Sequence, residues 1–362
     1  MLLVLYLDTK YCSHIGYYIN TAHPAREQDY SMKALRFHEF GSPADVLQLE
    51  EIPTPTPTDD EVLVRLTARS VNPSDLYTIM GTYGVRPKLP AVGGNEAAGV
   101  VEHVGANVSQ FAPGDRVTLM LGAVGTDGTW REYAAVRPDT IIHTPTGLSD
   151  EQAACAWVNY LTAWILAFED LDLQPDELLL VTAAASHLGR AMLQIAAHAG
   201  FKVIGTVRRE DQRQELLDLG AAGVIVTDSE DIGTRYRELT GKKAISKAVD
   251  AVGGVVGSAV AAALAPRGTL ILYGMMSGKP LRIGGEMIFS EATVRGFWLL
   301  RWMQNRAPQH IAQVVGQLSA LFADGTFAPA IDSTFDLADI KGMVERSSTP
   351  GRHGKVIITG PT

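Results

Sequence analysis

The sequence predicts an α/β protein with two domains, one built from short strands and one in which strands alternate with helices. From Met32 onward, apolar residues alternate at period two in short runs separated by glycine- and proline-rich turns, which is typical of a barrel-like, Greek-key domain. After Ser149, short apolar runs alternate with helical patterns, which indicates βαβ units and a parallel, doubly wound sheet. A chain of 362 residues has room for two such domains.

The β-rich part is expected to contain strands at 32–37, 46–52, 61–71, 97–105, 115–121 and 128–137. Turns rich in proline and glycine, such as 53–61 and 108–115, separate them. The stretch 72–96 holds so many glycines and prolines that it is expected to form a loop containing neither helix nor strand.

The α/β part is expected to begin with one long helix over 148–170, capped by Asp150. Strands at 178–184, 201–208, 223–228, 243–254 and 269–274 then alternate with helices, among them 189–200 and 209–220. Near Glu291 the chain is expected to return to the β-rich domain, with helices at 307–325 and 336–348 and a final strand at 354–360. The α/β domain is therefore inserted between two parts of the β-rich domain, and a ligand is expected between the two domains.

Composition excludes several classes of function. A formal charge of −9 argues against a nucleic-acid-binding face, and the absence of a long apolar run argues against a membrane helix. The two cysteines, Cys12 and Cys155, indicate a reducing compartment and no structural zinc lobe, so a cytoplasmic location is predicted. Residues 1–31 are a poor signal or transit peptide and are interpreted as an N-terminal extension outside the fold, mobile in solution.

The loop at 72–96 holds a candidate proton donor, Tyr83, between Gly81 and Gly84. A tyrosine flanked by glycines is expected to be open to a ligand on both sides. Spacing alone favours the alternative, a surface tyrosine in a tight turn.

Four segments in order resemble the medium-chain dehydrogenase/reductase superfamily: the loop with NPSD, GTYG and LPAVGGNE, then WVNYLTAW at 157–164, LYGMM at 272–276 and RGFWLLRW at 295–302. They are most similar to the mitochondrial-type trans-2-enoyl thioester reductases, and next to zinc-independent quinone oxidoreductases. The resemblance runs from Met32 to the end of the chain. It implies a GroES-like catalytic domain at 32–155 and 297–362, a Rossmann NADPH-binding domain at 156–296, and Tyr83 as the proton donor.

The turn between the strand at 178–184 and the following helix is expected to hold the cofactor pyrophosphate, because helix N-terminal N–H groups favour an anion. His187 stands where the family has a glycine, and its ring is expected either to bind the phosphate or to narrow the site. An ordinary turn is the alternative. At the end of the next strand, Arg208 and Arg209 favour the 2′-phosphate of NADPH over NADH, unless they simply begin a solvated helix.

The resemblance also implies which residues contact the cofactor, and each of them has a purely structural alternative. Asn72 and Asp75 are further expected to order the loop, and Glu96 to be a buried structural acid. The predicted cofactor contacts are Asn72, Asn159, Thr162, Ala185, Ser186, His187, Leu188, Gly189, Arg208, Arg209, Tyr273, Gly274, Met275, Met276, Phe297, Trp298 and Lys355.

No metal is expected, because zinc enzymes of the superfamily have a cysteine and a histidine where this chain has Pro73/Ser74 and Asn95. Without a Lewis acid to stabilise an alkoxide, hydride transfer to a conjugated carbon is favoured over alcohol oxidation. The predicted reaction is NADPH-dependent reduction of a 2-enoyl thioester carried on CoA or acyl carrier protein.

Two alternatives remain open: a quinone or alkenal reductase, and a non-catalytic NADPH-binding sensor, for which His187 is the best support. The resemblance further implies a homodimer that pairs through the strand near 271–297. Acyl chain length and the choice of carrier are left open.

Overall fold

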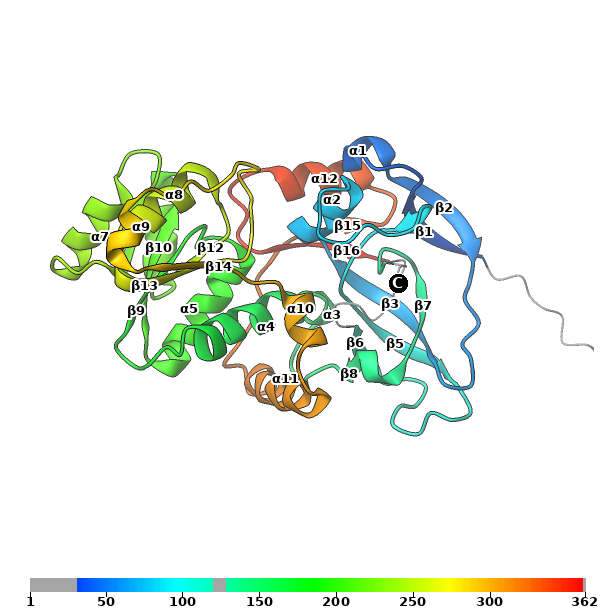
Figure 1. The fold of residues 1–362 in the computed structure, drawn as a ribbon. Helices are drawn as coiled ribbons and strands as arrows, with labels where there is room; N and C mark the ends of the chain where they lie inside the picture. The colour runs from blue at the N-terminus through cyan, green and yellow to red at the C-terminus, as the bar shows by residue number, and fades with distance from the viewer. Residues whose placement is uncertain (1–30, 120–127, 361–362) are drawn as a thin grey trace, which may run out of the picture.

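The structure, a computed structural model, describes residues 31–119 and 128–360. Nearly all of the expected N-terminal extension, Cys12 and the last two residues of the strand expected at 115–121 therefore lie outside the described residues. Figure 1 shows the β-rich part, mostly blue and cyan, beside the α/β part in green and yellow, with the red C-terminal elements back in the β-rich part. The expected fold class, an α/β protein with an antiparallel β-rich domain and a doubly wound parallel sheet, is confirmed.

The α/β domain is built on one six-stranded sheet in which all neighbouring strands are parallel. In the order β11-β10-β9-β12-β13-β14, successive strands are added in one direction from β9 to β11 and in the opposite direction from β12 to β14. The topological switch point therefore lies between β9 and β12. The strands are β9 (Leu178–Val181), β10 (Lys202–Val207), β11 (Gly223–Val226), β12 (Ile245–Asp250), β13 (Leu264–Leu272) and β14 (Thr293–Gly296).

Both faces of this sheet are covered, which explains its continuous apolar runs. Leu179 and Val181 lie in one hydrophobic cluster while Leu180, between them, lies in another. The first cluster includes α5 (His187–Ala199), and the second includes α7 (Ile232–Thr240) and α8 (Gly254–Ala262). The remaining helices of this domain are η3 (Glu210–Gln212), α6 (Arg213–Asp218) and α9 (Glu286–Ser290).

The β-rich domain has a large sheet of seven strands and a small one of three. The large sheet follows the order β15-β16-β3-β5-β6-β8, with β7 also on β3; the small sheet follows β2-β1-β4. The C-terminal strand β16 pairs with β3, which joins the two ends of the domain. The strands are β1 (Ser31–Phe37), β2 (Gln48–Pro53), β3 (Val62–Ser70), β4 (Ala91–Val92), β5 (Ala97–Val104), β6 (Arg116–Leu119), β7 (Tyr133–Val136), β8 (Ile141–His143), β15 (Ile331–Asp336) and β16 (Lys355–Thr359).

The expectation that 72–96 contains no regular structure is wrong. A helix, α2 (Pro73–Ile79), occupies its first part, and β4 lies near its end. Proline is suited to the first turn of a helix, and the Asp75 carboxylate stabilises that turn by accepting from the backbone N–H of Asn72 at 2.6 Å. The glycines begin only at Gly81, so the irregular structure is confined to residues 80–90 and 93–96.

The single helix expected over 148–170 is in fact three segments: α3 (Asp150–Ala153), α4 (Trp157–Ile165) and the π-helix η2 (Leu166–Asp170). Its N-cap is Ser149 and not Asp150. The first break has a visible cause, because the backbone N–H of Val158 donates to Glu96 Oε2 at 3.0 Å instead of continuing the helix.

The C-terminal part of the chain contains α10 (Leu299–Gln304), α11 (Pro308–Ala323) and α12 (Ile340–Ser348). The last helix begins later than the expected residue 336, because 331–336 form strand β15, parallel to β16. Short helices α1 (Pro43–Val46) and η1 (Pro138–Thr140) complete the fold. Within the described ranges, no helix has the length and apolar character needed to cross a membrane.

Candidate active site

Tyr83 and Trp298 form a hydrogen-bonded pair, although 215 residues separate them in the chain. The indole Nε1 of Trp298 donates to the Tyr83 hydroxyl at 2.8 Å, and the two rings meet edge to face with centroids 5.9 Å apart. An indole nitrogen can only donate, so the phenol oxygen is the acceptor and its own proton remains available to another group. The pair therefore presents one proton donor.

The loop around Tyr83 is shaped to receive Trp298. A Cβ added at Gly84 would lie 3.2 Å from the Trp298 ring, so glycine gives the indole room. Backbone N–H groups of Thr82 and Tyr83 both donate to the carbonyl of Tyr77, which fastens the loop to the end of α2. One side of the tyrosine is thus occupied by Trp298, and the expectation of access on both sides is wrong for that side.

Burial raises the pKa of Tyr83 above its ordinary value. The nearby Asp75 carboxylate acts in the same direction, while the hydrogen bond from Trp298 opposes it. A phenol of ordinary pKa ~10 is already protonated at neutral pH, so the upward shift keeps Tyr83 in the form that can donate.

A buried polar network lies beneath this loop and is centred on Asn72. Its Nδ2 donates to Ser70 Oγ at 3.0 Å and to Glu96 Oε1 at 2.9 Å. Its Oδ1 accepts from Asn159 Nδ2 at 3.2 Å and also from Lys355 Nζ. Two donor hydrogens and two acceptor positions are all that an amide side chain has. The network therefore argues against the expected cofactor contact of Asn72 and gives its side chain a structural role.

The same network includes two more of the expected cofactor contacts, Lys355 and Asn159. Lys355 is buried, and burial lowers its pKa while the Glu96 carboxylate raises it. Asn159 is half-buried, and its Nδ2 is directed at Asn72. The side-chain Oδ1 of Asn159 accepts no hydrogen bond within this network among the described residues, so it is the atom here that is suited to accept from a bound carboxamide.

Asp75 is a fully buried carboxyl group whose two oxygens both accept hydrogen bonds. Oδ2 accepts from the backbone N–H of Asn72 at 2.6 Å, and Oδ1 accepts from Asn95 Nδ2 at 2.5 Å. Burial raises the pKa of Asp75 to about 7, and the neighbouring Glu96 adds to the rise while the Asn72 N–H and Lys355 oppose it. The carboxyl group orders α2 and the loop that follows, as expected for Asp75.

The residues at the position of the superfamily's zinc do not fit a metal. Asn95 uses its amide to donate to Ser74 Oγ at 3.3 Å and to Asp75, and Glu96 accepts from Ser70, Asn72 and Val158. In the part of the chain that the structure describes, no group of three or more His, Cys, Asp and Glu side chains could hold a metal ion. No step of the chemistry below passes through zinc.

The turn after β9 has the features of a pyrophosphate cradle. Ser186 caps α5 by accepting from the Gly189 N–H at 3.2 Å, which leaves the N–H groups of His187 and Leu188 free of helical acceptors. A Cβ at Gly189 would lie 2.3 Å from the carbonyl oxygen of Ala184, so only glycine lets the helix approach the turn this closely. Ala185 lies in the same turn, and its carbonyl accepts from Arg190 Nε at 3.2 Å.

The ring of His187 does not serve the phosphate. It is buried, its Nε2 lies 3.1 Å from the carbonyl oxygen of Cys155, and its ring meets Tyr160 with centroids 6.0 Å apart. Burial lowers the pKa of His187 to about 3, and the positive charge of Lys355 adds to this. The neutral imidazole packs against α4, so the expectation that the ring binds or narrows the phosphate site is wrong. Only the backbone N–H of His187, at the start of α5, is placed to bind the phosphate.

At the end of β10, Arg208 is exposed and Arg209 is half-buried. Arg209 pairs with Asp211 at 3.0 Å, an exposed contact that an incoming phosphate can displace. A Cβ at Gly351 would lie 3.5 Å from Arg209 Nη2, so the loop before β16 passes beside this arginine.

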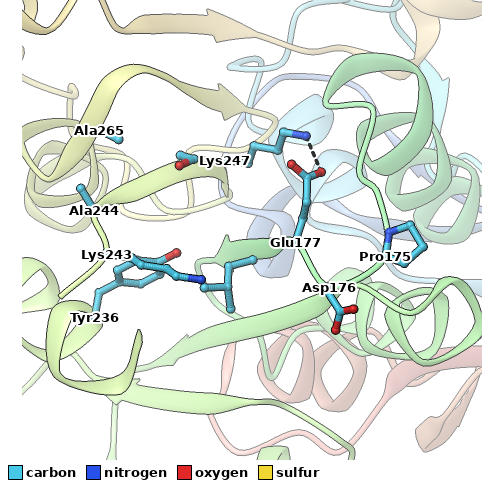
Figure 2. A pocket seen from close by; sticks show the side chains of 10 residues that line it. Pro175, Asp176, Glu177, Tyr236, Lys243, Ala244, Lys247 and Ala265 are labelled. Atoms are coloured by element: carbon cyan, nitrogen blue, oxygen red, sulfur yellow. Dashed lines mark hydrogen bonds and ion pairs between the residues drawn. The ribbon is translucent and has the colours of Figure 1, made fainter. Parts of the chain in front are cut away.

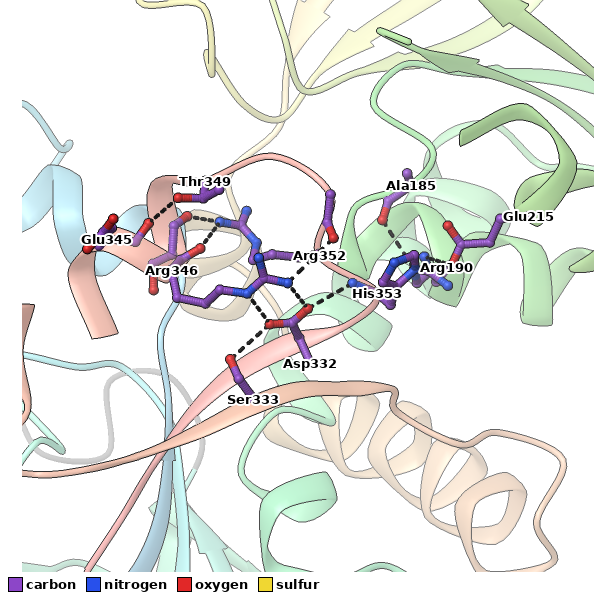
Figure 3. Close-up of polar contacts among 12 residues, drawn as sticks. Ala185, Arg190, Glu215, Asp332, Ser333, Glu345, Arg346, Thr349, Arg352 and His353 are labelled. Atoms are coloured by element: carbon purple, nitrogen blue, oxygen red, sulfur yellow. Dashed lines mark hydrogen bonds and ion pairs between the residues drawn. The ribbon is translucent and has the colours of Figure 1, made fainter. Parts of the chain in front are cut away.

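That C-terminal loop is fastened to the α/β domain at a second point (Figure 3). His353 Nδ1 lies 2.6 Å from Glu215 Oε1, and the same oxygen accepts from Arg190 Nη2 at 2.5 Å. The C-terminal loop therefore contacts the α/β domain beside Arg209 and again at Glu215.

The remaining expected contacts lie at the carboxyl ends of strands, where open α/β sheets bind ligands. Tyr273 follows β13, and its hydroxyl is buried without a hydrogen-bond partner among the described residues, as expected of a group awaiting a ligand. Met275 and Met276, just beyond Gly274, are exposed, while Phe297 is half-buried after β14 and Thr162 is buried in α4.

A hollow of about 550 Å³ lies elsewhere, at the amino ends of the parallel strands, where Lys247 and Glu177 pair at 2.6 Å (Figure 2). Its lining also includes Tyr236 and Lys243. Because ligands of doubly wound sheets bind at the carboxyl ends, this hollow is not the cofactor site.

Comparison with known proteins defines the class. A family model described as "Alcohol dehydrogenase GroES-like domain" matches residues 58–146, and one described as "Zinc-binding dehydrogenase" matches residues 188–316. The chain is therefore an oxidoreductase that belongs to the medium-chain dehydrogenase/reductase superfamily.

Individual proteins of this superfamily are similar over most of the chain. The mitochondrial enoyl-[acyl-carrier-protein] reductase of Rattus norvegicus is 33% identical, with 94% of this chain and 91% of the relative covered. Escherichia coli quinone oxidoreductase, solved with NADPH, is 28% identical with a TM-score of 0.82 and covers 90% of this chain and 99% of its own. The Candida tropicalis mitochondrial 2-enoyl thioester reductase Etr1p/Etr2p heterodimer is 26% identical with a TM-score of 0.78 and covers 91% and 100%.

Proposed function

We propose that the protein reduces the C2=C3 double bond of a 2-enoyl thioester with NADPH, and that Tyr83 protonates the α-carbon. The observation that carries this proposal is the Trp298–Tyr83 hydrogen bond of 2.8 Å, which fixes the phenol oxygen and leaves its proton free to be given away. The similarity to enoyl-[acyl-carrier-protein] reductases over 94% of the chain supports the same reaction.

NADPH, when bound, supplies the hydride that the β-carbon of the substrate accepts. The protein's own residues then have two tasks. Ser186 and the free N–H groups at the start of α5 hold the pyrophosphate. Tyr83 holds a proton beside the α-carbon, where a carbanion equivalent develops as the hydride is accepted. The tyrosinate that remains still accepts from Trp298, which stabilises its charge.

NADPH is proposed over NADH because Arg208 and Arg209 end the strand on which such enzymes read the adenosine ribose. The two acids that follow are paired with arginines: Glu210 with Arg213 at 2.6 Å and Asp211 with Arg209 at 3.0 Å. A guanidinium group binds phosphate through paired hydrogen bonds, which favours the 2′-phosphorylated cofactor.

A quinone or alkenal reductase is the second candidate, favoured by the similarity to Escherichia coli quinone oxidoreductase. Quinone reduction places its protons on oxygen, where water can supply them, so Tyr83 is not needed for it. The sensor alternative loses its support, because His187 is turned away from the phosphate turn.

NADPH oxidation measured with crotonyl-, hexenoyl- and decenoyl-CoA, a benzoquinone and acrolein tests the choice. We expect kcat/KM to be highest for one of the enoyl thioesters. A preference for the benzoquinone, unchanged in Tyr83→Phe, would establish the second candidate instead.

We further propose a homodimer formed at the free edge of β14. Among the described residues this strand pairs only with β13, and the neighbouring α9 exposes Ile288 (76%) and Phe289 (88%). Large apolar side chains beside an unpaired edge strand are suited to a two-fold contact that continues the sheet.

A further inference from the structure

Two consecutive acidic residues at the end of the π-helix η2 fasten the segment that carries Trp298. This segment runs from β14 through α10 to the start of α11. Trp298 is the N-cap of α10, and its indole holds the Tyr83 hydroxyl. The position of α10 therefore sets the position of the proton donor.

Glu169 holds the part of the segment that follows Trp298. Its Oε2 accepts from the indole Nε1 of Trp302 at 3.0 Å and lies 3.5 Å from Arg306 Nε. Its Oε1 lies 2.8 Å from His310 Nε2, at the start of α11. The Arg306 guanidinium also covers the Trp302 ring at 5.6 Å, so a single carboxylate organises three side chains.

Asp170 holds the part that precedes Trp298. Its Oδ1 pairs with Arg295 Nη2 at 2.8 Å, and its backbone carbonyl accepts from the same nitrogen at 3.3 Å. Arg295 lies three residues before Trp298 and Trp302 lies four residues after it. Glu169 and Asp170, which are adjacent residues of η2, therefore hold the chain on both sides of Trp298.

The π-helix explains how the adjacent residues Glu169 and Asp170 can both contact the segment that carries Trp298. The N–H of Leu171 donates to the carbonyl of Leu166, five residues back, at 3.1 Å. This wider turn inserts an extra residue into the helix, a rare feature that often accompanies functional sites. The turn continues directly from α4, which carries the expected cofactor contacts Asn159 and Thr162, so one helical unit reaches both these contacts and the Trp298 segment.

We infer that Glu169 is a positioning residue for the reaction: by holding Trp302, Arg306 and His310 it places Trp298, and through Trp298 the Tyr83 hydroxyl. Glu169 touches neither substrate nor cofactor in this assignment. The inference rests on the proposed function for its effect on turnover, but the coupling that it predicts between Glu169 and the position of Trp298, through Trp302, is independent of the substrate.

The kinetic test is a double-mutant cycle on kcat for crotonyl-CoA with NADPH. Glu169→Gln keeps the shape of the side chain but removes its charge, and we expect kcat to fall about tenfold with little change in the NADPH KM, because a small displacement of a catalytic group is costly. In a Trp298→Phe background the same change should lower kcat by less than about twofold, because coupled residues are not additive. Glu177→Gln, which breaks an acid–lysine pair far from the site, is the matched control and should leave kcat unchanged.

The second readout needs no activity. The five tryptophans give five indole N–H signals in a ¹⁵N NMR spectrum. The signal of Trp298 is the one that is missing from the spectrum of Trp298→Phe. That signal should move in Tyr83→Phe and in Glu169→Gln, and stay in place in Glu177→Gln. Should the wild-type protein reduce no enoyl thioester, the proposed function fails while this spectrum still decides the inference.

Arg295→Gln covers the case in which Glu169→Gln does not fold, because it loosens the other end of the segment at an arginine that is 39% exposed. It should shift the same indole signal and lower kcat. Full additivity of Glu169→Gln with Trp298→Phe, or an unmoved Trp298 signal in both Glu169→Gln and Arg295→Gln, would overturn the inference.

Discussion

Replacing Tyr83 by phenylalanine separates proton donation from every other role of this residue. The ring and its edge-to-face contact with Trp298 remain, but the hydroxyl that accepts the indole N–H at 2.8 Å is lost. General acid catalysis contributes ~10²–10⁴-fold, so we expect kcat on an enoyl thioester to fall within that range. The loss should appear in kcat and kcat/KM alike, because the interaction is made in the transition state.

The same variant has a predictable cost in stability. It leaves the Trp298 N–H without its acceptor in a half-buried position, and an unsatisfied donor costs about 1–3 kcal/mol of unfolding free energy. That is small enough for the protein to stay folded and to bind NADPH normally. Stopped-flow NADPH oxidation, fluorescence titration of NADPH and urea unfolding measure the three quantities. A Tyr83→Phe enzyme that binds NADPH and turns over an enoyl thioester at the wild-type rate would refute the assignment of the proton donor.

Three further predictions follow from other parts of the molecule. Replacing both Arg208 and Arg209 by alanine should raise the KM for NADPH far more than that for NADH; an equal rise for both cofactors contradicts a 2′-phosphate site. His187 has a pKa of about 3 in the folded protein against ~6.5 when unfolded, so the unfolded chain takes up a proton first as the pH falls, and the contribution of His187 to stability decreases by ~1.4 kcal/mol per unit from about pH 6.5 to about pH 3. Asp75, whose pKa is raised to about 7, has the opposite dependence, so the test compares the wild type with a His187 variant at each pH. His187→Gln, which can still donate to Cys155, should flatten that part of the curve, and an unchanged slope in urea unfolding between pH 5 and 7 argues against a buried neutral imidazole. Phe289→Asp should convert the proposed homodimer to monomer in light scattering at micromolar concentration, whereas a monomeric wild-type protein would remove the dimer altogether.

The parts of the fold that follow from periodicity were predictable from the sequence. The strand LLLV at 178–181 and the helix at 308–323 stand within the expected ranges, because burial on two faces or on one stripe leaves a clear pattern. The break between α3 and α4 was not predictable, because it depends on Glu96, which reaches Val158 from another domain. Strand β15 was missed because its run IDSTFD is polar and gains its order from pairing with β16.

The candidate site shows the same difference between features that have a local sequence pattern and features that depend on distant contacts. The motif around Tyr83 predicted this residue as the proton donor, which remains a proposal, but no local signal connects it to Trp298, which was expected only as a cofactor contact. The arrangement of Asn72 was also beyond the sequence, because its four hydrogen bonds come from segments near 70, 96, 159 and 355. Glu169 and Asp170 looked like the ordinary charged end of a helix, and only the π-turn brings both to the segment that carries Trp298.

The most direct test of the account is the product of crotonyl-CoA and NADPH in deuterated water, analysed by mass spectrometry and ¹H NMR. The account predicts butyryl-CoA with one deuterium on the α-carbon, delivered through the exchanged Tyr83 hydroxyl, and none on the β-carbon, which receives the cofactor's hydrogen. Absence of butyryl-CoA together with rapid reduction of a benzoquinone, or deuterium on the β-carbon, would contradict it.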